Sequence, residues 1–237
     1  MNEPRKRFGG QEVGAVIVAA GSGRRMRGTG DKLFLDLGGI PLLGLTLRNV
    51  VGAGIDNVVL VAGARIIDDV RTKILPLVEC PAPVILVEGG ARRQDSVLCG
   101  LQGFALPPRT VIVHDGDRPF ASSSLMAELA RSAASRGMIA AIPSRDTIKL
   151  VEGKTVVETL ERRKVWRAQT PQAFPYAELL AGHLRARTEG WEVTDDASIM
   201  ERSGFPVEVM EGSEENIKVT TPEDRGRARA IYRRLYE

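Results

Sequence analysis

The stretch Ala15-Val-Ile-Val-Ala-Ala-Gly-Ser-Gly-Arg-Arg-Met-Arg27 joins an apolar run to a glycine-containing turn that carries three arginines. The apolar run is typical of a buried strand, and glycine lets the main chain of the turn approach a ligand closely. Successive backbone N–H groups in such a turn form a concavity that binds anions, and guanidinium groups suit phosphate oxygens. The stretch therefore predicts a buried strand followed by a turn whose backbone binds a polyphosphate.

Two familiar phosphate-binding motifs do not match this turn. A P-loop has a lysine after its second glycine, but Thr29 follows Gly28 in this chain. A dinucleotide fingerprint has a third glycine where Met26 stands. We therefore interpret the turn as a nucleotide loop of another kind, with guanidinium groups and the nearby Lys32 on the phosphates. The alternative is a charged turn that contacts only solvent.

Composition sets the broad class of the protein. The 237 residues are 43% hydrophobic and 27% charged, which is ordinary for a globular chain of one α/β domain or two small ones. The formal charge of +3 and the pI of about 9.0 suit anionic small substrates as well as nucleic acid. Two cysteines without metal-type spacing are consistent with a reducing cytoplasm. No apolar run approaches the roughly 20 residues of a membrane span.

Strand-like and helical runs alternate along the chain, which predicts an α/β fold with a mostly parallel sheet covered by helices on both faces. We expect residues 1–12, which are polar and lack the apolar segment of a secretory signal, to form a disordered tail before a single domain at 13–237. The expected strands are 13–20, 57–62, 83–88, 110–114, 138–143 and 205–210. The expected helices are 41–52, 67–74, 96–104, 125–136 and 195–203, with Thr194 as the N-cap of the last, and a final helix begins at Thr221-Pro222.

Polar clusters follow several of these strands. Gly89 and Gly90 permit close backbone approach after the third strand, and Ser96 offers a hydroxyl near a helix start. Asp115 follows the fourth strand, where a carboxylate beside a phosphate loop suits Mg²⁺. Asp117 is either a second ligand of the metal or only an acidic residue of the turn. Ligands of such sheets bind outside the carboxyl ends of the strands, so we expect these clusters to meet the arginine turn there.

Residues 147–151 and 155–160 flank a glycine turn and predict a β-hairpin arm at about 146–163. An isolated hairpin is only marginally stable in water, so it must pack on another surface. That surface is either a partner subunit or the rest of its own domain, and the sequence leaves both open.

The chain lacks the motifs of covalent catalysis. No nucleophile elbow is present, and His114 and His183 are its two histidines. Phosphoryl and nucleotidyl transfer require neither, because an attacking phosphate monoester is already ionised and the enzyme only positions it and stabilises charge with Lys, Arg and Mg²⁺.

The motifs AAGSGRRM, DKLFLDLGGIPLL, GGARRQDSV, VHDGDRP, DTIK, QTPQAF, TDDAS and NIKVTTPED occur in this order between Val13 and the final helix. Together they resemble the 2-C-methyl-D-erythritol 4-phosphate cytidylyltransferases of the non-mevalonate isoprenoid pathway. The resemblance implies a Rossmann-like fold with a protruding hairpin arm, a magnesium-dependent transfer from CTP to a polyol phosphate, and a homodimer held through the arm. It implies no nucleic-acid or membrane partner.

The resemblance also implies roles for individual residues. Arg25 and Lys32 match the catalytic residues that stabilise the pentacoordinate phosphorus, and Lys218 matches a lysine that supports the phosphates. The matching contacts to CTP are Ala19, Ala20, Gly21, Gly23, Gly90, Ser96 and Asp115, and Asp115 also matches the metal site. The matching residues of the polyol phosphate site are Arg118, Thr147, Arg162, Thr170 and Thr194, of which Arg162 is presented by the arm of the second subunit.

Two positions depart from the family pattern, and two other functions stay open. Asp31 precedes Lys32 where proline is common, and Asp117 adds a charge where a small residue is usual. The nearest alternative function is a ribitol-5-phosphate cytidylyltransferase. A more distant one is a non-catalytic nucleic-acid-binding protein, suggested by the basic pI and the arginine-rich last helix but not by the 5% aromatic content.

Overall fold

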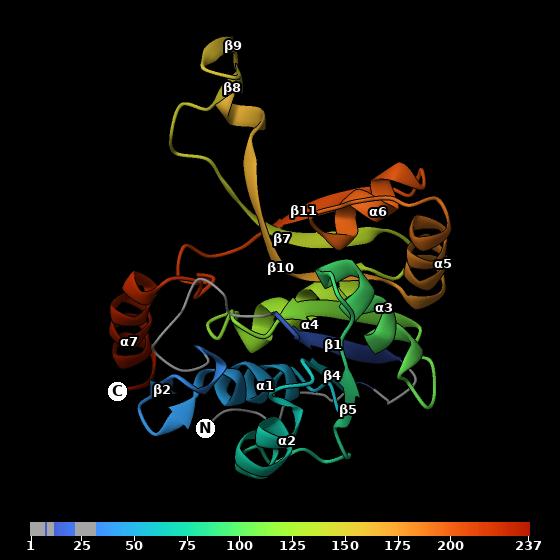
Figure 1. Cartoon of the computed structure of the whole chain (residues 1–237), viewed down its shortest axis with the longest axis vertical. Coiled ribbons are helices and arrows are strands. Elements are labelled where there is room, and N and C mark those ends of the chain that lie inside the picture. Colours follow the sequence, from blue (N-terminus) through green and yellow to red (C-terminus); the bar gives the residue numbers. More distant parts are fainter. Residues whose placement is uncertain (1–7, 9–11, 22–31) are drawn as a thin grey trace.

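A computed structural model of the chain describes residues 8, 12–21 and 32–237. Its main sheet has seven strands in the order β11-β7-β10-β6-β1-β4-β5 (Figure 1). Every neighbouring pair is parallel except those of β10, which is antiparallel to both β6 and β7. The strands are β1 (Val13–Ala19), β4 (Asn57–Ala62), β5 (Ile85–Glu88), β6 (Thr110–Asp115), β7 (Gly137–Pro143), β10 (Trp166–Pro175) and β11 (Val207–Glu211).

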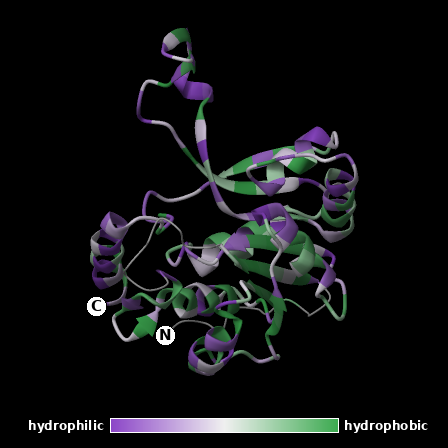
Figure 2. Cartoon of the chain, viewed as in Figure 1, coloured by the Kyte–Doolittle hydropathy of each residue, from purple (hydrophilic) through white to green (hydrophobic). Residues whose placement is uncertain are grey.

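Helices cover both faces of this sheet. Side chains alternate along β1, so that Ala15 and Ile17 join one hydrophobic core while Val16 joins the other. The first core also contains residues of α1 (Leu42–Gly52), α4 (Ser123–Ser132) and α7 (Pro222–Tyr236). The second contains residues of α3 (Arg93–Gln102), α5 (Tyr176–Thr188) and α6 (Asp196–Arg202). Figure 2 shows the apolar residues gathered on the central strands and polar ones on outer helices such as α7.

The predicted fold class is confirmed, with differences in single elements. The predicted helix 67–74 is a short α2 (Ile67–Asp69) that continues as π-helix Val70–Ile74 and 3-10 helix Leu75–Leu77. The helix expected at 96–104 begins earlier, at Arg93, because Arg92 and Asp95 form a capping box. The N-cap of α6 is Asp195, whose carboxylate accepts from the Ser198 N–H, so the prediction of Thr194 as the cap is wrong.

The predicted hairpin arm extends away from the body between β7 and β10 (Figure 1). It consists of β8 (Lys149–Glu152) and β9 (Thr155–Thr159), whose residues are all exposed. Gly153 has φ +61°, which suits the turn between them because glycine has no Cβ to clash there. Two shorter elements, the 3-10 helix Lys32–Phe34 and the small hairpin β2 (Asp36–Leu37) with β3 (Ile40–Pro41), precede α1. The 3-10 helix Arg162–Lys164 follows the arm.

Two residues of the predicted N-terminal tail are described, and both contact the body. The Phe8 N–H donates to the Gly54 carbonyl at 3.0 Å, and the Glu12 carbonyl accepts from the Thr110 N–H at 3.0 Å. The other residues of the tail lie outside the described part of the chain. Within the described ranges, none of the helices has the length and apolar content needed to cross a membrane.

Candidate nucleotide site

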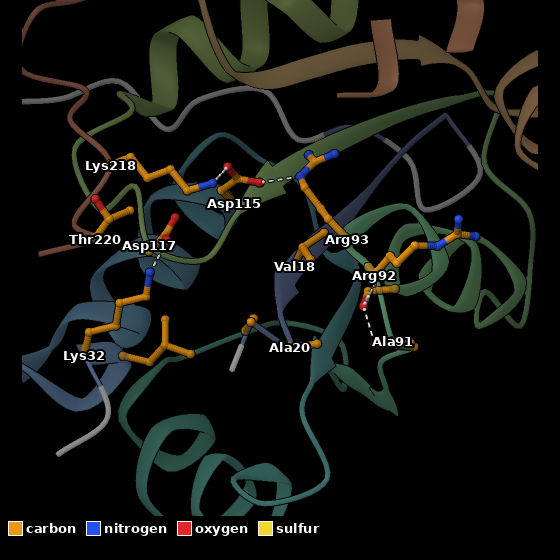
Figure 3. Close-up of a pocket in the computed structure, with 15 residues that line it drawn as sticks. Val18, Ala20, Lys32, Ala91, Arg92, Arg93, Asp115, Asp117, Lys218 and Thr220 are labelled. Atoms are coloured by element: carbon orange, nitrogen blue, oxygen red, sulfur yellow. Dashed lines mark hydrogen bonds and ion pairs between the residues drawn. The ribbon is translucent and has the colours of Figure 1, made fainter. Parts of the chain in front are cut away.

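A cavity of about 560 Å³ opens at the carboxyl ends of β1, β5 and β6 (Figure 3). The chain runs from β1 outward to β4 and β5 and then returns to place β6 on the other side of β1. This is a topological switch point, where ligands of open α/β sheets bind. The volume lies within the range of small-molecule sites. The fold itself therefore brings the strand ends with the predicted polar clusters into one cavity.

The turn after β6 is held by bonds from other strands and segments. The Asp115 N–H donates to the Thr170 hydroxyl at 2.9 Å, so β10 anchors the first residue of the turn. The Asp117 carbonyl accepts from the Val219 N–H at 3.0 Å, which joins the turn to the segment that carries Lys218. These bonds hold the backbone from which both carboxylates of the turn project.

Asp115 lies between two cations. Its Oδ2 accepts from Lys218 Nζ at 2.7 Å, and its Oδ1 accepts from Arg93 Nε at 3.0 Å. Burial of Asp115 opposes its ionisation, but the charges of Arg93 and Lys218 outweigh that effect and hold the pKa of the carboxyl well below its usual range. The group is therefore an anion at neutral pH, as a metal ligand must be.

Arg93 extends this network away from the cavity. Its Nη1 donates to Asp196 Oδ2 at 2.9 Å, and His183 Nε2 lies 3.0 Å from Asp196 Oδ1. Burial would raise the pKa of Asp196, yet Arg93 and its bond with His183 bring the pKa below the ordinary value. Neither Arg93 nor Asp196 is among the residues predicted from the sequence, although the first lies in the GGARRQDSV motif and the second in TDDAS.

Lys32 approaches the other carboxylate of the turn. Its Nζ lies 2.5 Å from Asp117 Oδ2, and the exposed fractions of the two side chains are 13% and 10%. Figure 3 shows the Lys32–Asp117 and Lys218–Asp115 pairs side by side along one wall of the cavity. Each of the two predicted active-site lysines thus contacts one carboxylate of the same turn.

The opposite wall is the loop between β5 and α3. A Cβ placed on Gly90 would lie 2.5 Å from the Asp95 Cβ, so the loop can pass this point only with glycine. The Ser96 hydroxyl donates to the Arg92 carbonyl at 3.1 Å and approaches the Gly90 carbonyl at 3.4 Å. Ser96 therefore shapes the loop as well as lining the cavity.

The structure brings most of the predicted nucleotide and catalytic residues together. Those that line the cavity are Ala19, Ala20, Gly21, Lys32, Gly90, Ser96, Asp115 and Lys218. Arg25 and Gly23 lie outside the described residues. Arg92, Arg93 and Thr220 also line it and were not singled out from the sequence. For the first two the available signal was a pair of arginines one residue after a glycine pair.

The predicted polyol phosphate residues do not line this cavity. The Thr170 hydroxyl is buried between the Asp115 N–H and His114 Nδ1, and Arg118 Nη1 donates to the Asn216 carbonyl at 2.7 Å. Thr147, Arg162 and Thr194 are exposed, and Arg162 Nη1 donates to the Arg145 carbonyl at 3.2 Å at the base of the arm. These five residues are spread over the turn after β6, β10, the arm and the segment before α6. In the described part of a single chain they do not form one site.

His114 is confirmed as a residue packed in the sheet. It is completely buried, with Nε2 3.1 Å from the Arg118 carbonyl and Nδ1 3.0 Å from the Thr170 hydroxyl. Burial lowers its pKa to about 4, so the ring is neutral at physiological pH. It supports the turn rather than facing the cavity.

The residues of the cavity fit a magnesium ion bound together with phosphates. Asp115 and Asp117 provide two carboxylates, and Asp117 Oδ1 is buried without a hydrogen-bond partner among the described residues. No group of three or more acidic, histidine or cysteine side chains with metal-binding geometry occurs in that part of the chain. Mg²⁺ is commonly held by one or two carboxylates, with phosphate oxygens and water completing its shell. This donor set matches that pattern.

Comparison with known proteins identifies the family. The family model described as IspD, 2-C-methyl-D-erythritol 4-phosphate cytidylyltransferase, matches residues 13–234. The chain belongs to this family. A relative of the same name from Prochlorococcus marinus (strain MIT 9313) is 43% identical over 219 residues, which are 91% of this chain and 96% of the relative.

Solved structures of IspD proteins share the fold. The crystal structure of 4-diphosphocytidyl-2C-methyl-D-erythritol synthase from Anaerococcus prevotii DSM 20548 has a TM-score of 0.83 at 32% identity, covering 94% of this chain and 97% of that one. The 2-C-methyl-D-erythritol 4-phosphate cytidylyltransferase of Thermus thermophilus has a TM-score of 0.74 at 33% identity, covering 94% and 99%. IspD membership makes the chain a nucleotidyltransferase, and it favours neither the ribitol-5-phosphate activity nor the nucleic-acid-binding alternative.

Proposed function

We propose that this chain transfers the cytidylyl group of CTP to the phosphate of 2-C-methyl-D-erythritol 4-phosphate and releases pyrophosphate. The observation that carries the proposal is the pairing of Lys32 and Lys218 with two carboxylates of one turn, opposite the Gly90 loop, in a cavity at the switch point of the sheet. Family membership supplies the identity of the two substrates. The positively charged groups are what an enzyme acting on a triphosphate requires.

The reaction needs positioning and charge stabilisation more than proton transfer. An oxygen of the substrate phosphate forms a bond to the α-phosphorus of CTP as the bond from that phosphorus to the bridging oxygen of pyrophosphate breaks in line with it. The attacking phosphate is already ionised, so no general base is required. We assign Lys32, Lys218 and Arg25 to the oxygens on which negative charge grows, and Ala19, Ala20, Gly21 and Gly23 to the phosphate-facing backbone.

We assign the divalent cation to Asp115. A bound Mg²⁺ would neutralise phosphate charge and help to orient the triphosphate. Lys218 holds one oxygen of Asp115, and its ammonium can turn from the carboxylate toward a phosphate because the lysine side chain is flexible. Gly90 and Ser96 are assigned to the cytidine end, where the loop between β5 and α3 passes the cavity. The cytoplasmic location expected from the cysteine content stays a prediction.

We further infer that the polyol phosphate site is completed by a second subunit. The arm exposes Leu150, Val151, Val156 and Val157, each by about half of its surface, and Trp166 at its base by 41%. Apolar side chains gathered on an isolated hairpin favour burial against a partner. In a homodimer joined through the arm, Arg162 and Thr147 of one protomer would face Arg118, Thr170 and Thr194 of the other.

The experiment that tests the proposed function is pyrophosphate release from CTP with Mg²⁺ and each of two polyol phosphates. We expect turnover with 2-C-methyl-D-erythritol 4-phosphate and little with ribitol 5-phosphate, and we expect ATP, GTP and UTP to be poor donors. Faster turnover with ribitol 5-phosphate would contradict the assignment of the substrate. Absence of pyrophosphate release with both would contradict the activity.

A further inference from the structure

Asp117 places a second carboxylate in the cavity, two residues after Asp115. Its Oδ2 contacts Lys32 Nζ at 2.5 Å, and Figure 3 shows the two side chains pointing toward one another. Its Oδ1 is buried and has no hydrogen-bond partner among the described residues. Asp117 is one of the two carboxylates available to a cation, but the proposed reaction assigns the cation to Asp115 and gives Asp117 no task of its own, although its carboxylate touches Lys32 directly.

The two carboxylates of the turn are neutralised to different extents. Asp115 forms ion pairs with Lys218 and Arg93 and lies 3.9 Å from Arg118 Nε. For Asp117, Lys32 is the one ion-pair partner within the part of the chain that the structure describes. When Lys32 shares its charge with a phosphate, Asp117 therefore keeps less compensation for its own charge than Asp115 does.

The aspartate is also the less movable member of the pair. Its carbonyl is bonded to the Val219 N–H at 3.0 Å, and the turn is closed by a bond from the Arg118 N–H to the Asp115 carbonyl at 3.1 Å. Lys32 ends in an ammonium with three donors on a flexible four-carbon chain. The lysine can thus donate to a phosphate oxygen and to Asp117 together, while the carboxylate keeps it at this wall of the cavity.

We propose that Asp117 is a positioning residue that holds Lys32 at the phosphate site and whose charge opposes the binding of polyphosphates without a metal. The inference rests on the proposed function, because it assumes that Lys32 contacts the phosphates of CTP. A negative charge at this wall repels a metal-free triphosphate or pyrophosphate. The same charge restricts the ammonium to the place where the reaction uses it.

Binding without metal tests the electrostatic half of the proposal. Dissociation constants of pyrophosphate and CTP are measured by calorimetry in EDTA for the wild type, Asp117→Asn, Asp117→Glu and Asp68→Asn. We expect Asp117→Asn to bind both ligands about 10-fold more tightly, since one near charge commonly shifts affinity by this order. Asp117→Glu keeps the charge, and Asp68→Asn removes one from an exposed site on α2, so both should bind as the wild type does. Equal affinities of wild type and Asp117→Asn would overturn the proposal.

A double-mutant cycle with Lys32 tests the positioning half. We expect Asp117→Asn to lower kcat by roughly 10-fold in the wild-type background and to have almost no effect on kcat in the Lys32→Ala background, because residues that act together are not additive. Asp117→Glu should restore part of kcat. A loss of the same factor in both backgrounds would mean that Asp117 acts independently of Lys32, through the fold or as a second ligand of the cation, and it would overturn the positioning role. Asp117→Ser replaces Asp117→Asn if the latter does not fold.

The measurements distinguish a failure of the proposed cytidylyl transfer from a failure of the proposed role of Asp117. A wild-type protein that neither binds CTP nor releases pyrophosphate would remove the proposed function, and this inference with it. An active wild type whose Asp117→Asn variant keeps its affinity for metal-free pyrophosphate would remove only the inference about Asp117.

Discussion

Lys32 and Lys218 reach the same cavity from distant parts of the sequence, and each forms an ion pair with a carboxylate of the turn after β6. If both stabilise charge on the reacting phosphates, Lys32→Ala and Lys218→Ala should each lower kcat by about 100-fold or more, with a smaller change in KM for CTP. Steady-state pyrophosphate release measures both constants. Lys73→Ala is the matched control, because Lys73 is exposed and pairs with Asp69 on the surface. Near-normal turnover in either pocket variant would exclude that lysine from the reaction.

His114 makes the stability of the protein depend on pH. Burial lowers its pKa from 6.5 to about 4. Between these two values the imidazole is protonated in the unfolded chain but neutral in the folded one. The stabilisation is complete above pH 6.5 and is lost as the pH falls toward 4. We expect the free energy of unfolding to decrease by about 2 kcal/mol between pH 7 and pH 5 from this residue.

Urea unfolding in metal-free buffer measures that decrease. The range from pH 7 to pH 5 lies above the ordinary pKa of aspartate, so protonation of aspartate side chains contributes little to the decrease. His114→Gln keeps an amide that can bond to the Thr170 hydroxyl but does not titrate, and its unfolding free energy should change less across the same range. A wild-type value that is constant from pH 7 to pH 5 would contradict the prediction.

At the scale of elements, Arg93 links α3 to β6 and α6 by its bonds to Asp115 and Asp196. Arg93→Leu would leave two buried carboxylates without their main counter-charge, so we expect a loss of about 3–5 kcal/mol in the free energy of unfolding. Arg136→Ala breaks an exposed pair with Glu208 and should cost below about 1 kcal/mol. Similar losses in the two variants, measured by denaturant titration, would show that the buried network is not coupled to stability.

The parallel part of the fold was predictable because its strands are continuous apolar runs between glycine and proline signals. β10 was not predicted, since its sequence WRAQTPQAFP mixes polar and apolar residues and its pairing with β7 shifts register between Ala168 and Gln172. Gln169 and Gln172 are buried there only because their amides bond to distant groups, such as the Ser213 carbonyl and the Asp195 carboxylate. A local pattern does not contain such partners.

The same reason limits prediction of the site. Glycine and hydroxyl residues that follow strands could be placed at one edge of the sheet, and Ala20, Gly90 and Asp115 do meet there. The ion pairs of Arg93 with Asp196 and of Lys32 with Asp117 join residues 103 and 85 positions apart. Spacing within a motif carries no information on such pairs, so they become visible only in the folded chain.

At the scale of the whole molecule, a protruding arm with exposed valines predicts a dimer. Val156→Asp with Val157→Asp should reduce the mass measured by sedimentation from that of two chains to that of one, because charges on this surface oppose its burial. Val209→Asp is the control, since Val209 is 47% exposed but lies on β11, away from the arm. A single-chain mass for the wild type at micromolar concentration would contradict the prediction.

A dimer whose arms complete each other's sites can also be tested by complementation. Lys32→Ala and Arg162→Ala chains should each have little activity alone, the first through loss of phosphate stabilisation and the second through loss of polyol phosphate binding. After unfolding and refolding together in equal amounts, half of the dimers are mixed, and each mixed dimer has one site with its own Lys32 and the partner's intact arm. The mixture should therefore recover roughly a quarter of wild-type turnover, as expected from random pairing in a two-fold symmetric dimer. If Arg162 served the site of its own chain, every mixed dimer would keep one defect in each site, and the mixture would remain as inactive as its components.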